Sequence, residues 1–260
     1  WAGMDKVNFQ NLPSRDKKKK ALKNAVVAPD GYVVINCDSS QIEARVLAWL
    51  AGQENVVKQF AKGEDVYSLF ASDIYDRPIS KADPVERFVG KTCILGLGYG
   101  TGAMKLQHTL KTTLATLANW EKTDNPFYYG QHKCLEVYPE GIRLPNGLYI
   151  RYPELRLNTE EKSHYEYKSR KGPVSIWGGT LVENVVQALA RIVVGEQMIK
   201  IRERYAVKLT VHDAAVVIVP EAEKDEAMAY VVECMTVAPE WAKGLPVACE
   251  AKYATSYGEC

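Results

Sequence analysis

The fold is decided by one stretch, YVVINCDSSQIEARVLAWL, which occupies residues 32–50. Its first part is rich in apolar and β-branched residues and predicts a buried strand that ends at Asp38. The second part has apolar side chains at helical spacing, which predicts a helix with one buried face. These side chains are Ile42, Val46, Leu47 and Leu50. The order is therefore strand, carboxylate, helix.

A second carboxylate lies between two apolar runs near the end of the chain. Residues 208–219 hold these β-rich runs on either side of His212-Asp213, so we expect a tight hairpin with Asp213 at its tip. Each acid has a structural alternative, because Asp38 with Gln41 could cap the following helix and Asp is common in turns. If the strands are neighbours in one sheet, both acids project from the same edge and can share divalent cations. Paired Mg²⁺ ions of this kind support in-line phosphoryl displacement.

The clearest helix start in the sequence is at Asp83. Pro84 follows it and Glu86 stands three positions after it, which is the pattern of a capped helix N-terminus. We expect this helix to run to the glycines at residues 96–102.

Side chains along this helix recur at i, i+4 steps and form one slowly drifting stripe. The stripe consists of Arg87, Lys91, Leu95 and Tyr99. A charged stripe is often only a solvated face, but this one carries no acid after Glu86. Arg binds phosphate bidentately and Lys acts as a point charge, so a triphosphate could lie along the helix with a nucleobase near Tyr99.

Two glycine motifs near the stripe do not indicate phosphate loops. Gly90-Lys91-Thr92 resembles the end of a P-loop, but Val85 occupies the position where the first glycine is required. The glycines of residues 96–100 lack the dinucleotide-binding spacing and do not follow a strand. Neither motif therefore predicts a nucleotide site of its own.

Weaker patterns organise the rest of the chain. Residues 142–150 predict a hairpin around Asn146-Gly147, and helical spacing predicts one long helix from Thr180 to about Arg204. Three further expectations are a helical and connecting region over 103–140, a polar exposed region over 153–175, and a last strand around Val247.

The composition is that of an ordinary globular protein. The chain has 260 residues, 25% of them charged, with a net charge of +1, so a nucleic-acid site would have to be a local patch. The six cysteines form no Cys-x-x-Cys pair, which argues against a zinc site and a disulfide framework. No apolar run approaches the roughly 20 residues of a membrane span, so we expect a soluble cytoplasmic protein. Because the chain starts at Trp1, it looks like a piece of something longer.

Three ordered motifs resemble those of the family A DNA polymerases, and more particularly the phage-type members. Residues 38–45 (DSSQIEAR) resemble the first palm motif, residues 87–100 the fingers motif, and residues 211–213 (VHD) the last palm motif. Residues 8–13 (NFQNLP) match the segment that the family keeps upstream of the first acid.

The resemblance implies an α+β fold, with a palm built on an antiparallel sheet, mainly helical fingers and no thumb. The palm would comprise residues 1–50 and 176–260, and the fingers with connecting regions residues 51–175. The implied activity is DNA-directed DNA synthesis for replication, by two-metal nucleotidyl transfer to a primer 3′ end. Its partners would be primer–template DNA and deoxynucleoside triphosphates (dNTPs), and the protein would be monomeric.

The resemblance also implies roles for the motif residues. Asp38 and Asp213 would bind two Mg²⁺ ions, assisted by the Ser39 carbonyl. Arg87 and Lys91 would hold the triphosphate, with Lys91 as proton donor to pyrophosphate.

Further residues would contact the nucleotide and the DNA. Glu43 would be the steric gate that fills the space of a ribose 2′-hydroxyl, and Leu95 and Tyr99 would flank the base. Ser39 and Gln41 would complete the nucleotide site. The implied DNA contacts are Gln10, Asn11, Arg15, Asn184, Gln187 and His212.

The chain departs from the family pattern at several points. Leu95 stands where the family usually has Phe or Tyr, and Ala214 stands where a Glu usually follows the last acid. We expect altered sugar discrimination and slower incorporation from the first change. The Arg expected before the upstream motif would lie at or before Trp1, and no thumb or proofreading exonuclease is included. The alternatives are a DNA- or nucleotide-binding fragment that has lost catalysis, and an unrelated α+β domain with incidental motifs.

Overall fold

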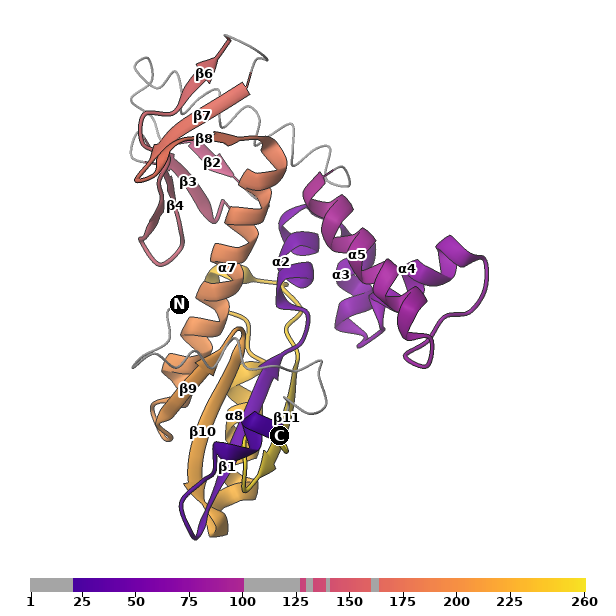
Figure 1. Cartoon of the computed structure of the whole chain (residues 1–260), viewed down its shortest axis with the longest axis vertical. Helices are drawn as coiled ribbons and strands as arrows, with labels where there is room; N and C mark the ends of the chain where they lie inside the picture. Colours follow the sequence, from indigo (N-terminus) through magenta and orange to yellow (C-terminus); the bar gives the residue numbers. More distant parts are fainter. Residues whose placement is uncertain (1–20, 101–126, 130–132, 139–140, 160–163) are drawn as a thin grey trace. The chain divides into compact units, whose positions relative to one another are not determined.

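The computed structural model describes residues 21–100, 127–129, 133–138, 141–159 and 164–260. The chain forms two compact units (Figure 1). The described parts of Trp1–Ile42, Val193–Pro239 and Val247–Cys260 make the first unit, and those of Glu43–Ile192 and Glu240–Pro246 make the second. The described elements are helices and antiparallel strands, which confirms the predicted α+β class.

The first unit is built on a four-stranded antiparallel sheet. Its strands follow the order β11 (Cys249–Ala254), β1 (Tyr32–Ser39), β10 (Ala214–Pro220) and β9 (Val207–Val211). The predicted strand before Asp38 and the predicted hairpin around His212-Asp213 are both confirmed. The last strand begins at Cys249, two residues after the predicted position.

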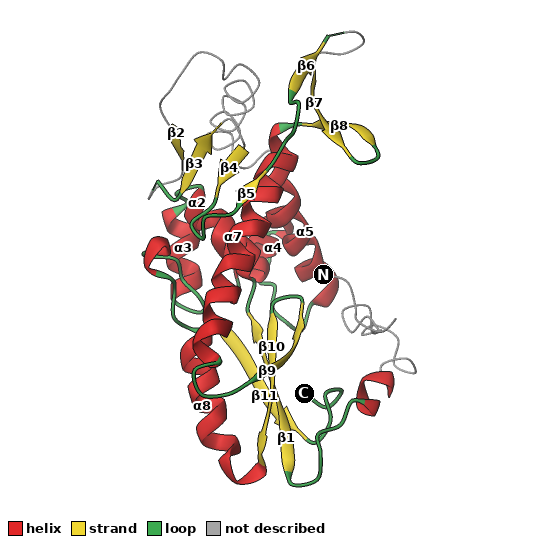
Figure 2. Ribbon diagram, turned by 90° about the vertical axis from the view of Figure 1, so that its left-hand side faces the viewer, coloured by secondary structure: helices red, strands yellow, loops and turns green. Residues whose placement is uncertain are grey.

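Strand β1 is apolar on both sides because both faces of the sheet are covered. Val33, Ile35 and Cys37 are buried against α8 (Lys224–Met235), which covers one face of the sheet (Figure 2). Val34 belongs to a second apolar cluster with Val216. A strand that is buried on both faces has a nearly continuous run of apolar residues, and residues 32–37 have this pattern.

A long helix, α7 (Gly178–Ile201), confirms the helix predicted from residue 180. Its residues through Ile192 belong to the second unit and those from Val193 to the first. Near its end, the buried Gln197 side chain donates hydrogen bonds to the carbonyls of Met235 (2.9 Å) and Val237 (3.1 Å).

Four helices form one part of the second unit. They are α2 (Ile42–Leu50), α3 (Glu54–Ala61), α4 (Val66–Tyr75) and α5 (Pro84–Gly100). Their common core consists of Ala44, Ala48, Phe60, Val66 and Tyr67. Helix α5 starts after Asp83, as predicted. The Glu86 carboxylate does not accept the Asp83 N–H as in a capping box, because Glu86 pairs with Arg77 and the Asp83 N–H donates to the Ser80 carbonyl.

Two small antiparallel sheets make the other part of the second unit. One contains β2 (Phe127–Tyr129), β3 (Leu135–Tyr138), β4 (Gly141–Arg143) and β5 (Tyr149–Ile150), and the other contains β6 (Arg156–Asn158), β7 (His164–Ser169) and β8 (Gly172–Ile176).

The structure confirms two sequence expectations in this region and corrects one. The hairpin at 142–150 is confirmed, with Gly147 at a φ of +81°. The helical expectation for 103–140 is wrong at 127–129 and 135–138, where Leu135 and Val137 are buried in the alternating pattern of a strand. The polar region at 153–175 is largely exposed in its described part, as expected, and it forms a sheet that the sequence did not predict, in which the buried Glu166 accepts hydrogen bonds from Arg156 and Asn158.

Short 3₁₀ turns connect some elements, at Ala21–Ala25, Glu221–Glu223 and Glu240–Ala242. Over the part of the chain that the structure describes, no helix combines the length and the apolar character needed to cross a bilayer.

Candidate active site

The two predicted acids meet at one end of the sheet of the first unit. Asp38 lies near the end of β1, directly opposite Ala214 of β10, and Asp213 occupies the turn between β9 and β10. The Ser39 N–H donates to the Asp213 carbonyl over 3.3 Å, which ties the turn to the end of β1. The two carboxyl groups interact directly.

Partial burial, together with the neighbouring acids, makes the Asp38 carboxyl hard to ionise. Partial loss of water around it, the neighbouring Asp213 carboxylate and the charge of Glu250 raise the pKa of Asp38 to about 7. Asp38 nevertheless keeps access to solvent. A site with crowded carboxylate oxygens that is open to water favours a hard divalent cation, because the cation offsets the repulsion.

The donor set near these acids is small. No group of three or more His, Cys, Asp or Glu side chains is arranged to hold a metal ion within the described ranges. The carboxylate oxygens of Asp38 and Asp213 are of the ligand type that Mg²⁺ takes together with phosphate oxygens and water.

The predicted nucleotide-site residues that follow Asp38 in the sequence differ in burial and backbone conformation. The Ser39 side chain is buried, and its hydroxyl makes no hydrogen bond to any residue the structure describes. Gln41 has a φ of +54° just before α2. Glu43 lies in the first turn of α2 and is half-buried, and its charge contributes to a raised pKa of Tyr67.

The predicted stripe on α5 lies in the second unit. Arg87 and Lys91 both lie over the ring of Tyr67, with the Arg87 Cζ 5.5 Å and the Lys91 Nζ 6.0 Å from its centroid. Burial is the main cause that raises the pKa of Tyr67 to about 12. Leu95 packs against the core of the helices α2–α5, and Tyr99 lies in the last turn of α5.

The predicted DNA-contacting residues fall in separate places. Asn184 on α7 donates a hydrogen bond of 2.9 Å to the Tyr152 hydroxyl, and the exposed Gln187 donates one of 3.4 Å to Glu183. His212 is exposed and has a φ of +53° beside Asp213. The remaining three, Gln10, Asn11 and Arg15, lie outside the described residues.

Sequence reasoning missed residues that surround the predicted ones. Glu250 of β11 lies directly opposite Asp38, and only the pairing of β11 with β1 reveals this. Asp65 precedes α4 and pairs with Arg87. Its place before an apolar helical run was a cap signal, but nothing local connects it with a residue on another helix.

Comparisons with known proteins agree with these observations. The sequence model of DNA polymerase family A matches residues 3–123. The chain is 30% identical over 281 residues to a DNA polymerase of Bacillus phage SP02, and the match covers 91% of the chain and 42% of that protein. It is 25% identical to DNA polymerase I of Rhizobium leguminosarum, over 97% of the chain and 25% of that protein. Over 40% of the chain it is 37% identical to the thermostable DNA polymerase I of Thermus aquaticus, covering 12% of that protein.

The fold is similar to that of a solved structure. The POL domain of Pol1 from M. smegmatis, in complex with a DNA primer-template and dNTP, superposes with a TM-score of 0.66 at 23% identity. The superposition covers 96% of this chain and 44% of that one. The chain thus spans less than half the length of these relatives.

Proposed function

We propose, since this chain belongs to DNA polymerase family A, that it extends a primer strand by nucleotidyl transfer from dNTPs. The observation that carries the proposal is the meeting of Asp38 and Asp213 at one end of an antiparallel sheet. In this proposal the sheet serves as the palm and the helices α3–α5 belong to the fingers. The proposed boundaries are 1–50 and 176–260 for the palm and 51–175 for the fingers and connecting regions.

The two acids would hold the metal ions of the reaction. Asp38 and Asp213, with the Ser39 carbonyl, would bind two Mg²⁺ ions through oxygen atoms. When bound, such ions lower the pKa of the attacking 3′-hydroxyl and neutralise charge on the pyrophosphate. The raised pKa of Asp38 supports this assignment, because a cation between the carboxylates would relieve their repulsion.

The α5 stripe and the start of α2 would bind the nucleotide. Arg87 offers planar N–H donors to phosphate oxygens, and Lys91 offers a mobile charge and a proton for the leaving pyrophosphate. Glu43 would exclude a 2′-hydroxyl by occupying its space.

The polar side chains of α7 and the β9–β10 turn would contact the duplex. The amides of Asn184 and Gln187, with the imidazole of His212, can hydrogen-bond minor-groove acceptors. Because these acceptors are similar for all base pairs, such contacts check shape without reading sequence. The same role is proposed for Gln10, Asn11 and Arg15.

A second candidate is a protein that binds DNA and nucleotides without catalysis. Two observations favour it. Ala214 leaves the β10 position beside Asp38 without a charge, and Leu95 packs into a helical core.

Primer extension with Mg²⁺ separates the two candidates. The protein at the full length its gene encodes is compared with Asp213→Asn and with Asp225→Asn, a control at an exposed position in the first turn of α8. We expect Asp213→Asn to lose at least about a hundredfold in extension rate and to bind Mn²⁺ more weakly. The control should keep both properties.

Two results would contradict the leading proposal. Extension by Asp213→Asn at the rate of the unchanged protein would refute the role of the acid pair. Binding of primer–template DNA and dNTP without extension by the unchanged protein would favour the second candidate.

A further inference from the structure

The Arg87 guanidinium is held by the carboxylate of Asp65, the residue just before helix α4. Its Nε donates to Asp65 Oδ2 over 2.6 Å and its Nη2 donates to Asp65 Oδ1 over 3.1 Å. The Ser68 hydroxyl donates to Asp65 Oδ2 over 2.8 Å and so fixes the carboxylate in turn. Both partners of the ion pair are largely shielded from solvent, with side chains 27% and 20% exposed. A shielded bidentate pair of this kind fixes the direction of the guanidinium plane.

The pair leaves one edge of the guanidinium available. Arginine has five N–H donors, and Asp65 uses those on the Nε and Nη2 side. Within the described ranges, the side-chain hydrogen bonds of Arg87 come from its Nε and Nη2, and none comes from Nη1. A phosphate can therefore bind Arg87 at this edge without breaking the pair with Asp65.

A close contact between helices α4 and α5 keeps the pair in register. A Cβ added at Gly90 would lie 2.2 Å from the Tyr67 carbonyl oxygen and 3.0 Å from the Ala71 Cβ. Only glycine permits this approach. Gly90 stands between Arg87 and Lys91 in the sequence, so the residue that resembled a P-loop glycine instead brings α4 close to the stripe.

We propose that Asp65 is a positioning residue for nucleotide binding. It holds Arg87 in one rotamer, with the unused edge of the guanidinium ready for the triphosphate. An arginine side chain without such a partner would sample several rotamers, and fixing one of them on binding the triphosphate would lower the affinity. The inference rests on the proposed phosphate-binding role of Arg87.

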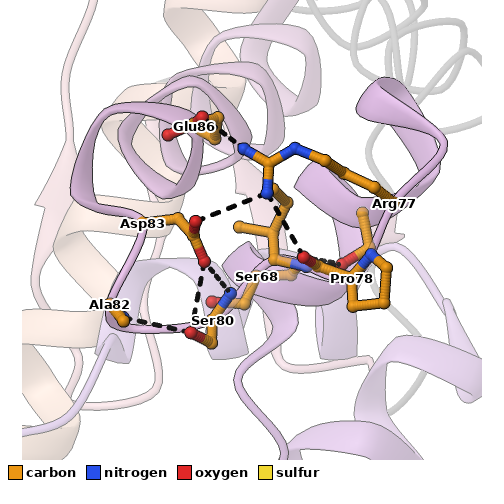
Figure 3. A network of polar contacts seen from close by, with 9 residues as sticks. Ser68, Arg77, Pro78, Ser80, Ala82, Asp83 and Glu86 are labelled. Carbon is orange, nitrogen blue, oxygen red and sulfur yellow. Dashed lines mark hydrogen bonds and ion pairs between the residues drawn. The ribbon is translucent and has the colours of Figure 1, made fainter.

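The test compares Asp65→Asn with a matched control in the full-length polymerase. The control is Glu86→Gln. Glu86, on α5, forms a different ion pair with an arginine, because its carboxylate lies 2.5 Å from Nη2 of Arg77 in the connection between α4 and α5 (Figure 3). We expect Asp65→Asn to raise the KM for dNTP about tenfold, with kcat within about twofold and unchanged affinity for primer–template DNA. Glu86→Gln should leave all three values unchanged. Urea unfolding of both variants establishes that they are folded.

A KM for Asp65→Asn equal to that of the unchanged protein would overturn the proposal. A lower KM would also overturn it, because Asp65 would then compete with the phosphates for Arg87. An equal rise in KM for Glu86→Gln would show that any loosening of α4 and α5 raises the KM, and this result would also overturn the proposal.

A double-mutant cycle separates this inference from the proposed function. Arg87→Gln should raise the KM for dNTP, and Asp65→Asn should add nothing in the Arg87→Gln background. If Arg87→Gln raises the KM and Asp65→Asn does not, the positioning role alone is wrong. If Arg87→Gln leaves the KM unchanged, the phosphate-binding role is wrong and the inference falls with it.

Discussion

Gly90→Ala adds one methyl group at a close contact between α4 and α5. The new Cβ would lie 2.2 Å from the Tyr67 carbonyl oxygen, 3.0 Å from the Ala71 Cβ and 3.2 Å from the Ala71 nitrogen. A carbon atom normally stays about 3.5 Å from such atoms, so the helices must separate by roughly 1 Å.

The expected cost follows from two opposing effects. Overpacking at a tight contact costs about 1–3 kcal/mol, because the backbone has to move. Replacing glycine by alanine inside a helix returns about 1 kcal/mol. We therefore expect Gly90→Ala to lower the free energy of unfolding by about 0–2 kcal/mol, toward the upper end because the atom contacted is backbone.

Urea unfolding followed by circular dichroism measures this difference, and Gly96→Ala is its control. Gly96 lies on the same helix, is exposed, and has no heavy atom of the described residues within 4 Å of an added Cβ. Gly96→Ala should therefore stabilise the protein by up to about 1 kcal/mol. Equal unfolding midpoints for the two variants would refute the reasoning that Gly90 is required by helix packing.

Two further predictions concern the first unit. Asp38→Asn should raise the melting temperature of the metal-free protein at pH 8 and change it little near pH 4. Folding raises the pKa of Asp38 from 3.8 to about 7, so in this window the unfolded chain loses the proton first and stability falls as pH rises. Parallel pH profiles for the two proteins would contradict this explanation. Gln197→Leu should destabilise the protein by about 2–3 kcal/mol in urea unfolding, because two carbonyls lose their donor. Ile199→Gln, at a position 69% exposed on the same helix, is its control, and an equal effect of both changes would count against the role of Gln197.

Local patterns were sufficient to predict the elements that carry the site. The apolar run before Asp38 and the paired runs around Asp213 each identify a strand, because the sheet is buried on both faces. Whether these strands are neighbours was open in the sequence, and the pairing of Asp38 with Ala214 answers it. Helix α5 was predictable from its first residues, since Asp83 and Pro84 mark the start.

Contacts between distant segments could not be predicted in this way. Asp65 lies just before α4 and Arg87 lies on α5, 22 positions later, and neither carries a local sign of the other. Glu250 becomes a neighbour of Asp38 only through the pairing of β11 with β1. The strands β2 and β3 are short, so their two-residue alternation was too brief to stand out from a helical pattern.

The path of the chain between the two units has a consequence for synthesis on the ribosome. The chain changes unit four times, after Ile42, Ile192, Pro239 and Pro246. The last segment of the second unit is Glu240–Pro246. In this segment, the Lys243 carbonyl accepts a hydrogen bond from the indole of Trp49, which lies 194 positions earlier. The Pro246 carbonyl likewise accepts one from the buried Arg45, 201 positions earlier. Helix α2 therefore leaves the ribosome well before the segment Glu240–Pro246, which supplies both of these acceptors. A stop codon at position 240 would therefore remove residues of both units, Glu240–Pro246 of the second and Val247–Cys260 of the first.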